Sequence, residues 1–109
     1  MRFLFLLSLI FFSIATSGMC KEIKGIGLAL GKFIVINGIA SQSVSISNNL
    51  KKNLTRVEIE CGFFQADKLV ASENSFVKNL DAGETGYTDV LALNSSEAET
   101  AKCRTVSVE

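Results

Sequence analysis

The stretch Thr55–Phe64 constrains the fold most, because the polarity of its side chains alternates at almost every residue. Its apolar members are Val57, Ile59, Cys61 and Phe63, and its charged members are Arg56, Glu58 and Glu60. A period of two is that of an extended strand whose successive side chains point to opposite faces of a sheet. One apolar and one charged face indicate an antiparallel sheet that packs on one side and meets water on the other. We therefore predict an all-β fold.

The flanking sequence predicts further short strands separated by turns. Phe33–Ile36 is a β-branched apolar run that ends at Asn37-Gly38, the strongest short signal for a tight hairpin turn. Ser41–Ser47 alternates serine with Val44 and Ile46, so we expect these two side chains inside and the hydroxyls outside. Further strands are expected at 54–64, 69–71, 75–78, 85–93 and 102–108, and a helical turn at 97–101. Arg104, Val106 and Val108 are expected on one face of the last strand. Turn signals about every ten residues are typical of a β-sandwich, which we place at 33–109.

The order of these features resembles the FxLYD-type immunoglobulin-like domain of exported bacterial proteins. Four segments carry the resemblance: Val44–Asn48, the alternating strand 54–64 that ends in aromatics, Asp67–Val70, and Leu80–Glu84 with its Gly-Glu turn. The resemblance implies a small antiparallel immunoglobulin-like β-sandwich. It also implies an accessory or interaction module that has no catalytic residues.

Residues 1–19 have the pattern of a secretory signal peptide. Met1-Arg2 is positively charged, and the apolar run that follows, Phe3–Ile14, is shorter than the roughly 20 residues of a membrane span. Small residues at 15–18 then suit a signal peptidase, so we expect the mature chain to begin between Gly18 and Lys21. The alternative is a retained N-terminal anchor. Residues 20–32, with three glycines, are expected to form a flexible leader or an irregular first edge strand before the domain.

Three cysteines in an exported chain would meet an oxidising compartment. Cys61 belongs to the inward face of the central strand and Cys103 to the last strand, so we predict a disulfide between them. Cys20 is left over as a free thiol, as a site of intermolecular bridging, or as a lipid-attachment site. If residues 1–19 are cleaved off, only lipidation of Cys20 would bring the domain to a membrane, as a lipoprotein. Otherwise we expect a secreted or periplasmic protein.

The composition excludes much of ordinary enzyme chemistry. The chain has no histidine and no tryptophan, which removes the usual general base near pH 7, Ser-His and Cys-His pairs, and the commonest zinc ligand. No carboxylate spacing suggests a calcium loop. The 11 basic and 11 acidic side chains cancel, so no nucleic-acid partner is indicated. We expect no enzyme activity, catalytic residue, cofactor or metal.

Two function classes remain open. The first is an exported module for protein–protein interaction or envelope structure that recruits a protein through a sheet face or edge. The second is a small secreted or periplasmic enzyme inhibitor that presents a loop to its target. The candidate partner-binding residues are Phe33 and Val35 on the first strand, expected to be a free edge, and Gly83, Glu84 and Tyr87 in and after a turn.

Overall fold

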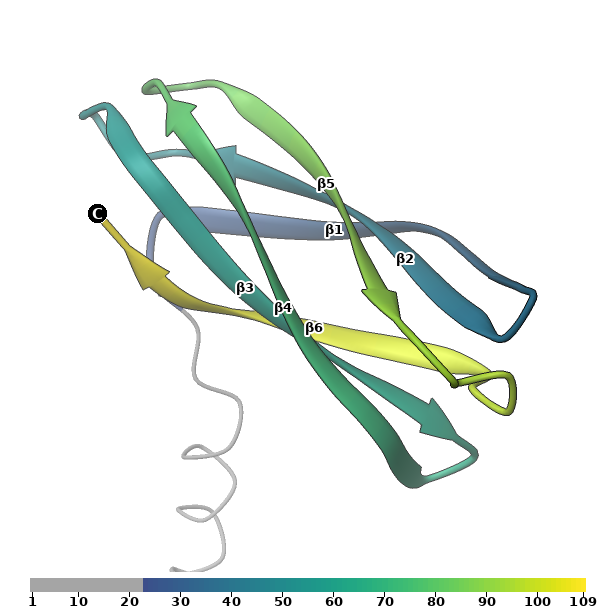
Figure 1. Cartoon of the computed structure of the whole chain (residues 1–109). Helices are drawn as coiled ribbons and strands as arrows, with labels where there is room; N and C mark the ends of the chain where they lie inside the picture. The colour runs from purple at the N-terminus through teal and green to yellow at the C-terminus, as the bar shows by residue number, and fades with distance from the viewer. Residues whose placement is uncertain (1–22) are drawn as a thin grey trace, which may run out of the picture.

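The computed structural model describes residues 23–109, which form six β-strands (Figure 1). The strands are β1 (Ile26–Ile36), β2 (Ile39–Asn48), β3 (Leu54–Gln65), β4 (Lys68–Leu80), β5 (Thr85–Ala92) and β6 (Thr100–Val108). All pairings are antiparallel, and no helix occurs between residues 23 and 109. The predicted all-β antiparallel class is confirmed. The predicted signal peptide and Cys20 lie outside the described residues.

The strands form two three-stranded sheets that share one core (Figure 1). Sheet A has the order β1-β2-β5 and sheet B the order β4-β3-β6. The connections β2 to β3, β4 to β5 and β5 to β6 each pass from one sheet to the other. Consequently β1 and β5 are the edges of sheet A, and β4 and β6 are the edges of sheet B. One open corner brings β1 near β6, and the other brings β5 near β4.

The core lies between the inner faces of the two sheets. Its fully buried apolar side chains on β3 are Val57, Ile59, Cys61 and Phe63. Val44 and Ile46 of β2 face them, with 2 % or less of each residue exposed. The alternation predicted for both strands is therefore confirmed. Burial of a large aliphatic or aromatic side chain stabilises the fold by about 1.5 to 3 kcal/mol, so these two strands dominate the core.

Two turns have the backbone that their residues predict. Asn37 and Gly38 have φ values of 52° and 81° and connect Ile36 to its partner Ile39. Both central residues of a type I′ turn need positive φ, which asparagine and glycine adopt with little strain. Gly83 has a φ of 83° in the turn between β4 and β5, as expected for the glycine there.

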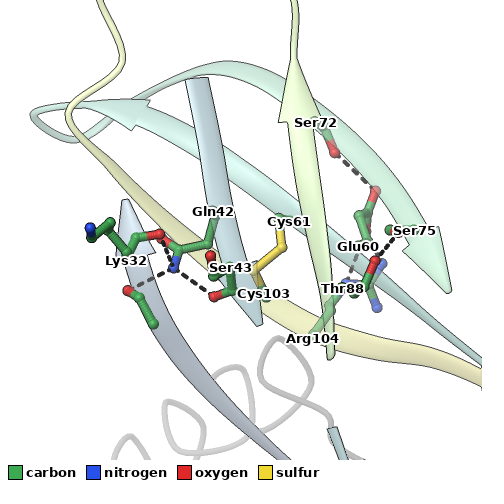
Figure 2. Close-up of a disulfide and its surroundings, with 11 residues drawn as sticks. Lys32, Gln42, Ser43, Glu60, Cys61, Ser72, Ser75, Thr88, Cys103 and Arg104 are labelled. Atoms are coloured by element: carbon green, nitrogen blue, oxygen red, sulfur yellow. Dashed lines mark hydrogen bonds and ion pairs between the residues drawn. A yellow bond between two sulfur atoms is a disulfide. The ribbon is translucent and has the colours of Figure 1, made fainter. Parts of the chain in front are cut away.

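The first strand is longer than predicted, because residues 26–32 of the glycine-containing segment form an irregular part of this edge strand and not a flexible leader. Residues 26–30 pair with β2, and Ile26 is buried in the core. The register shifts between Leu30 and Phe33, so β1 contains a bulge there. Gln42 stabilises the bulge: its buried Nε2 donates hydrogen bonds to the carbonyls of Gly31 (3.1 Å) and Ser43 (2.9 Å), with a longer contact to that of Lys32 (3.4 Å; Figure 2).

Three further expectations are corrected along the second half of the chain. The two short strands predicted at 69–71 and 75–78 are one continuous strand, β4. Residues 97–101 form no helical turn, and β6 already begins at Thr100. The pairing of β3 with β6 shifts register between Glu58 and Ile59, which leaves Val106 of β6 without a partner residue on β3. Because that irregularity breaks the alternation, Arg104 pairs with Glu60 on the outer face, whereas Val108 packs against the core.

Asn48 is a fully buried polar residue at the end of β2 that joins three segments. Its Nδ2 donates hydrogen bonds to the carbonyls of Lys52 (2.9 Å) and Leu80 (3.0 Å), and its Oδ1 accepts one from the Leu50 N–H (3.0 Å). A buried amide is tolerated when it is hydrogen-bonded in this way. Asn48 therefore fixes the 49–53 loop and the end of β4 against sheet A.

Candidate functional site

Five large aliphatic side chains lie together on the outer face of sheet A. They are Ile34, Ile36, Ile39, Leu91 and Leu93, here called the aliphatic patch, and between 37 and 66 % of each residue is exposed. The register places Ile34, Ser41 and Leu91 in one row across the sheet, and Ile36 opposite Ile39 in the next. Leu93 follows β5 directly and continues the second row. Contiguous groups of exposed aliphatic side chains are common at interaction surfaces, so the aliphatic patch is the candidate site.

The rest of this outer face is flat and bears little charge. Serines 43, 45 and 47 line the centre, and Tyr87 and Asp89 lie opposite Ser45 and Ser43 on β5. A shallow cavity of about 320 Å³ is lined in part by these residues. The three strands of sheet A carry two formal charges, those of Lys32 and Asp89, whereas the three strands of sheet B carry eight. The outer surface of sheet A is therefore less hydrated than that of sheet B.

Four charged side chains of sheet B form two ion pairs on its outer face, Arg56–Glu58 (3.7 Å) and Arg104–Glu60 (2.7 Å). Glu60 Oε1 accepts hydrogen bonds from Arg104 Nη2 (2.7 Å) and Nε (3.1 Å), and its Oε2 accepts one from Ser72 Oγ (3.0 Å; Figure 2). These donors stabilise the carboxylate and lower the pKa of Glu60 below its ordinary value of 4.5. Glu58 likewise accepts a hydrogen bond from Asn74 Nδ2 (2.9 Å).

The aromatic side chains of sheet B's outer face are covered by cations. The Arg56 guanidinium lies 4.1 Å from the centroid of the Phe76 ring, and the Lys102 ammonium 5.3 Å from that of Phe64. Such contacts place a cation over each ring face within the domain, and the buried Nε of Arg56 makes no hydrogen bond. A partner of sheet B would have to displace them, whereas a partner of the aliphatic patch displaces only water.

The edge of β1 offers unpaired backbone groups. Ile36 and Ile39 close a two-residue hairpin, so they form a hydrogen-bonded pair, and bonded and non-bonded pairs then alternate along the ladder. At the far end of β2 the Asn49 N–H donates a hydrogen bond to the Gly25 carbonyl (2.8 Å). Odd-numbered residues on this side of the ladder therefore bond to the β1 segment at both ends. Phe33 and Val35 fall in non-bonded pairs, so their backbone N–H and C=O groups point to the free edge.

The predicted partner-binding residues do not form one site. The side chains of Phe33 and Val35 pack against the core, and the exposed side chains of the run 33–36 are those of Ile34 and Ile36. Tyr87 lies on the outer face of sheet A with 76 % of the residue exposed. Gly83 and Glu84 lie in the turn before β5, where Glu84 Oε1 accepts a hydrogen bond from the Asp81 N–H (2.8 Å).

Sequence reasoning missed the aliphatic patch. The run Phe33–Ile36 was interpreted as one apolar segment, and its parity was not assigned. One signal in the sequence could have revealed the patch: all four residues of the run are apolar, so apolar side chains point to both faces of the strand, and both faces would have to be buried to shield them. In the structure only the face that bears Phe33 and Val35 is covered, so Ile34 and Ile36 stay exposed.

The predicted disulfide is present between Cys61 and Cys103. The two residues are direct partners on the neighbouring strands β3 and β6, so the bridge lies within sheet B (Figure 2). Cys61 is fully buried, and Cys103 lines a groove of about 300 Å³ at the open corner between β1 and β6. The bridge ties the last strand to the centre of its own sheet.

Residues 23–109 bring together no group of three or more cysteine or acidic side chains that could bind a metal ion. Within the same range, no helix has the length and apolar character needed to cross a membrane. None of the family models, curated proteins or solved structures that were compared with the chain matches it significantly. The candidate site therefore depends on the geometry of the aliphatic patch and the β1 edge alone.

Proposed function

We propose that the chain is an exported, non-catalytic module that binds a protein partner through the aliphatic patch. The contrast between the two outer faces carries the proposal: sheet B carries eight charged side chains, four of them in ion pairs, whereas sheet A leaves five aliphatic side chains exposed. Complete burial of an exposed aliphatic side chain is worth about 1.5 to 3 kcal/mol, so burial of the exposed half of five gives roughly 4 to 7 kcal/mol. Binding to sheet B would instead remove water from ion pairs, which costs free energy.

We also propose that the domain is an immunoglobulin-like sandwich, which the strand order supports; its assignment to the FxLYD type depends on the sequence resemblance alone. In immunoglobulin-like domains one sheet contains strands A, B and E, and the other contains C and F, with C′ added beside C in some of them. The orders β1-β2-β5 and β4-β3-β6 correspond to A-B-E and C′-C-F. The bridge between Cys61 and Cys103 then joins C to F within one sheet, unlike the B to F bridge of antibody domains.

The disulfide is compatible with an oxidising compartment outside the cytoplasm. Together with the signal-peptide pattern of residues 1–19, it supports secretion or a periplasmic location. Lipidation of Cys20 would instead hold the same module at a membrane. We include the absence of enzyme activity in the proposal because the chain lacks histidine altogether.

Two matched variants test the binding face. Leu91 on sheet A and Leu69 on sheet B have nearly equal exposed fractions, 53 and 54 %. Immobilised wild-type protein, Leu91→Lys and Leu69→Lys should be incubated with the native envelope or secreted fraction, and the captured proteins identified by mass spectrometry. Leu91→Lys should lose a partner that Leu69→Lys retains. Equal capture by both variants would refute the aliphatic patch as the binding face.

The alternative of an enzyme inhibitor is favoured by one observation, the preformed turn at 81–84. Gly83 has positive φ there, and Glu84 makes a hydrogen bond to the backbone within the turn. If the module is an inhibitor, Glu84→Ala and Tyr87→Ala should weaken capture of a single enzyme, and the wild-type protein should abolish the activity of that enzyme. Full capture by both variants would exclude this mode.

A further inference from the structure

We propose that the free edge of β1 pairs with the β1 edge of a second copy of the chain, joining two A sheets into one six-stranded sheet. The proposal does not rest on the proposed function, because it uses the backbone edge of β1 and needs no other protein. Within residues 23–109, β2 is the only strand that shares a ladder with β1. The outward N–H and C=O groups of Phe33 and Val35 are therefore available to another strand.

The bulge limits which part of the edge can pair. Residues 26–30 lie before the bulge and line the groove that faces β6. Residues 33–36 lie after it, between Lys32 and the Asn37-Gly38 turn. A second β1 strand can therefore meet only this short segment. An interface of this size is expected to be weak and reversible rather than obligate.

One register satisfies the outward groups of both copies. In a two-fold antiparallel pair centred on Ile34, Phe33 lies opposite Val35 of the second copy, and Val35 lies opposite its Phe33. Both are residues whose backbone groups point outward, so the pair can form four hydrogen bonds. Centring the pair on Val35 would place Phe33 opposite the turn residue Asn37, and centring it on Phe33 would place Val35 opposite the bulge. Only the register centred on Ile34 pairs the outward backbone groups of Phe33 and Val35 in both copies.

The side chains in this register are compatible with a second copy. Ile34 meets Ile34 of the other chain on the outer face, and Lys32 meets Ile36, so no like charges oppose one another. The two aliphatic patches then adjoin across the two-fold axis. Natural edge strands are usually protected by charges, proline or bulges. On β1 the bulge and Lys32 protect the part of the edge before Phe33, whereas segment 33–36 itself carries no charge and no proline.

Cysteine substitution tests the register directly. At the two-fold axis the Ile34 Cα atoms would lie about 4.5 Å apart, a non-hydrogen-bonded pair that a disulfide can bridge. The Ile36 Cα atoms would lie four residues out of register, about 13 Å apart. Both side chains face outward, and 42 and 59 % of the residues are exposed, so their thiols would be comparably accessible.

The exported chain should carry Cys20→Ser so that no native thiol outside the Cys61–Cys103 bridge competes. On mild oxidation Ile34→Cys should give a disulfide-linked dimer on a non-reducing gel, whereas Ile36→Cys should remain monomeric. Equal crosslinking of both variants would show random collision and would overturn the proposal. Failure of both variants to crosslink would also overturn it.

Sedimentation analysis tests the same interface without added thiols. The wild-type chain should pass from monomer to dimer between about 1 μM and 1 mM, the range in which weak interfaces form. Val35→Pro removes one outward N–H per copy, and the loss of two hydrogen bonds should raise the dissociation constant about thirtyfold. Circular dichroism should show that this variant stays folded.

Ile34→Lys provides a second variant that leaves the backbone hydrogen-bonding groups unchanged. It should also abolish dimerisation, because it places two lysines opposite each other across the two-fold axis. Leu91→Lys is its matched control on the far strand of the same sheet, and it should dimerise like the wild type even if it loses a protein partner. Three results would each overturn the proposal: a wild-type chain that is monomeric throughout, unimpaired dimerisation of Ile34→Lys, and stable capture of a different protein at the edge.

Discussion

Replacing the buried Asn48 with alanine should destabilise the domain more than any other change of a polar side chain in the described residues. The substitution removes two donors and one acceptor, leaving the Leu80 carbonyl, the Lys52 carbonyl and the Leu50 N–H without their partner. The bond to Leu80 is buried, whereas water can reach the other two sites.

The cost follows from these three contacts. An unsatisfied buried backbone group costs about 1 to 3 kcal/mol, so we assign about 2 kcal/mol to the Leu80 carbonyl and about 1 kcal/mol to each of the other two groups. The total of about 4 kcal/mol is a large share of the 5 to 15 kcal/mol typical of a small domain. Equilibrium unfolding in urea, followed by circular dichroism, measures the loss.

The neighbouring Asn49 supplies a matched control. Asn49 is exposed, and only its backbone N–H bonds to Gly25, so Asn49→Ala should change the free energy of unfolding by less than about 0.5 kcal/mol. Should Asn48→Ala cost no more than Asn49→Ala, the proposed role of the Asn48 side chain in joining the two sheets would be refuted.

A second substitution at the same position adds a pH test. Asn48→Asp keeps the shape but directs a carboxyl group at two carbonyl oxygens, which raises the folded-state pKa of the new group above its unfolded value of about 3.9. The folded state then binds more protons, so the stability of this variant should rise as the pH falls toward 4. A variant whose stability is independent of pH in that range would contradict the burial of this site.

Other substitutions test the bridge, the ion pair and the turn. Replacing Cys61 and Cys103 with serine opens a loop of 42 residues and should lower the free energy of unfolding by about 4 kcal/mol in urea titration. Glu60→Gln should cost up to about 1 kcal/mol at pH 7. Because the folded pKa of Glu60 is lowered, this difference should vanish as the pH falls from 4.5 through that pKa, and a constant difference would contradict the pairing. Gly83→Ala should cost about 1 to 2 kcal/mol from backbone strain alone, since no atom lies near the new Cβ, whereas Gly27→Ala, at ordinary φ, should be nearly neutral by thermal unfolding.

Local patterns predicted the parts of the fold that local physics decides. The alternation in β3 and β2 fixed which side chains are buried, because a strand with one apolar face can bury only that face. Asn37-Gly38 predicted its turn because the positive φ values are a property of those two residues. The Cys61–Cys103 pairing followed from two cysteines on strands that were already assigned.

The remaining features depend on contacts between distant segments. The pairing of residues 26–30 needs β2 as a partner and Gln42 to hold the bulge, and neither is visible in the glycine-rich sequence itself. The parity of β6 changes at a bulge that exists only against β3. The candidate site was mispositioned for the same reason: whether Val35 or Ile34 is exposed is decided by where sheet B lies, not by the run in which both residues occur.

The bridge between Cys61 and Cys103 also determines how the domain responds to force. A pull applied at the two ends of the chain would peel β1 from β2 and release the residues before Cys61 and after Cys103. The covalent loop of 42 residues between them cannot extend, which withholds about 150 Å of contour length. Under tension the protein would therefore lengthen by a limited step and then behave as a tether whose closed loop still contains β4, β5 and the paired ends of β3 and β6.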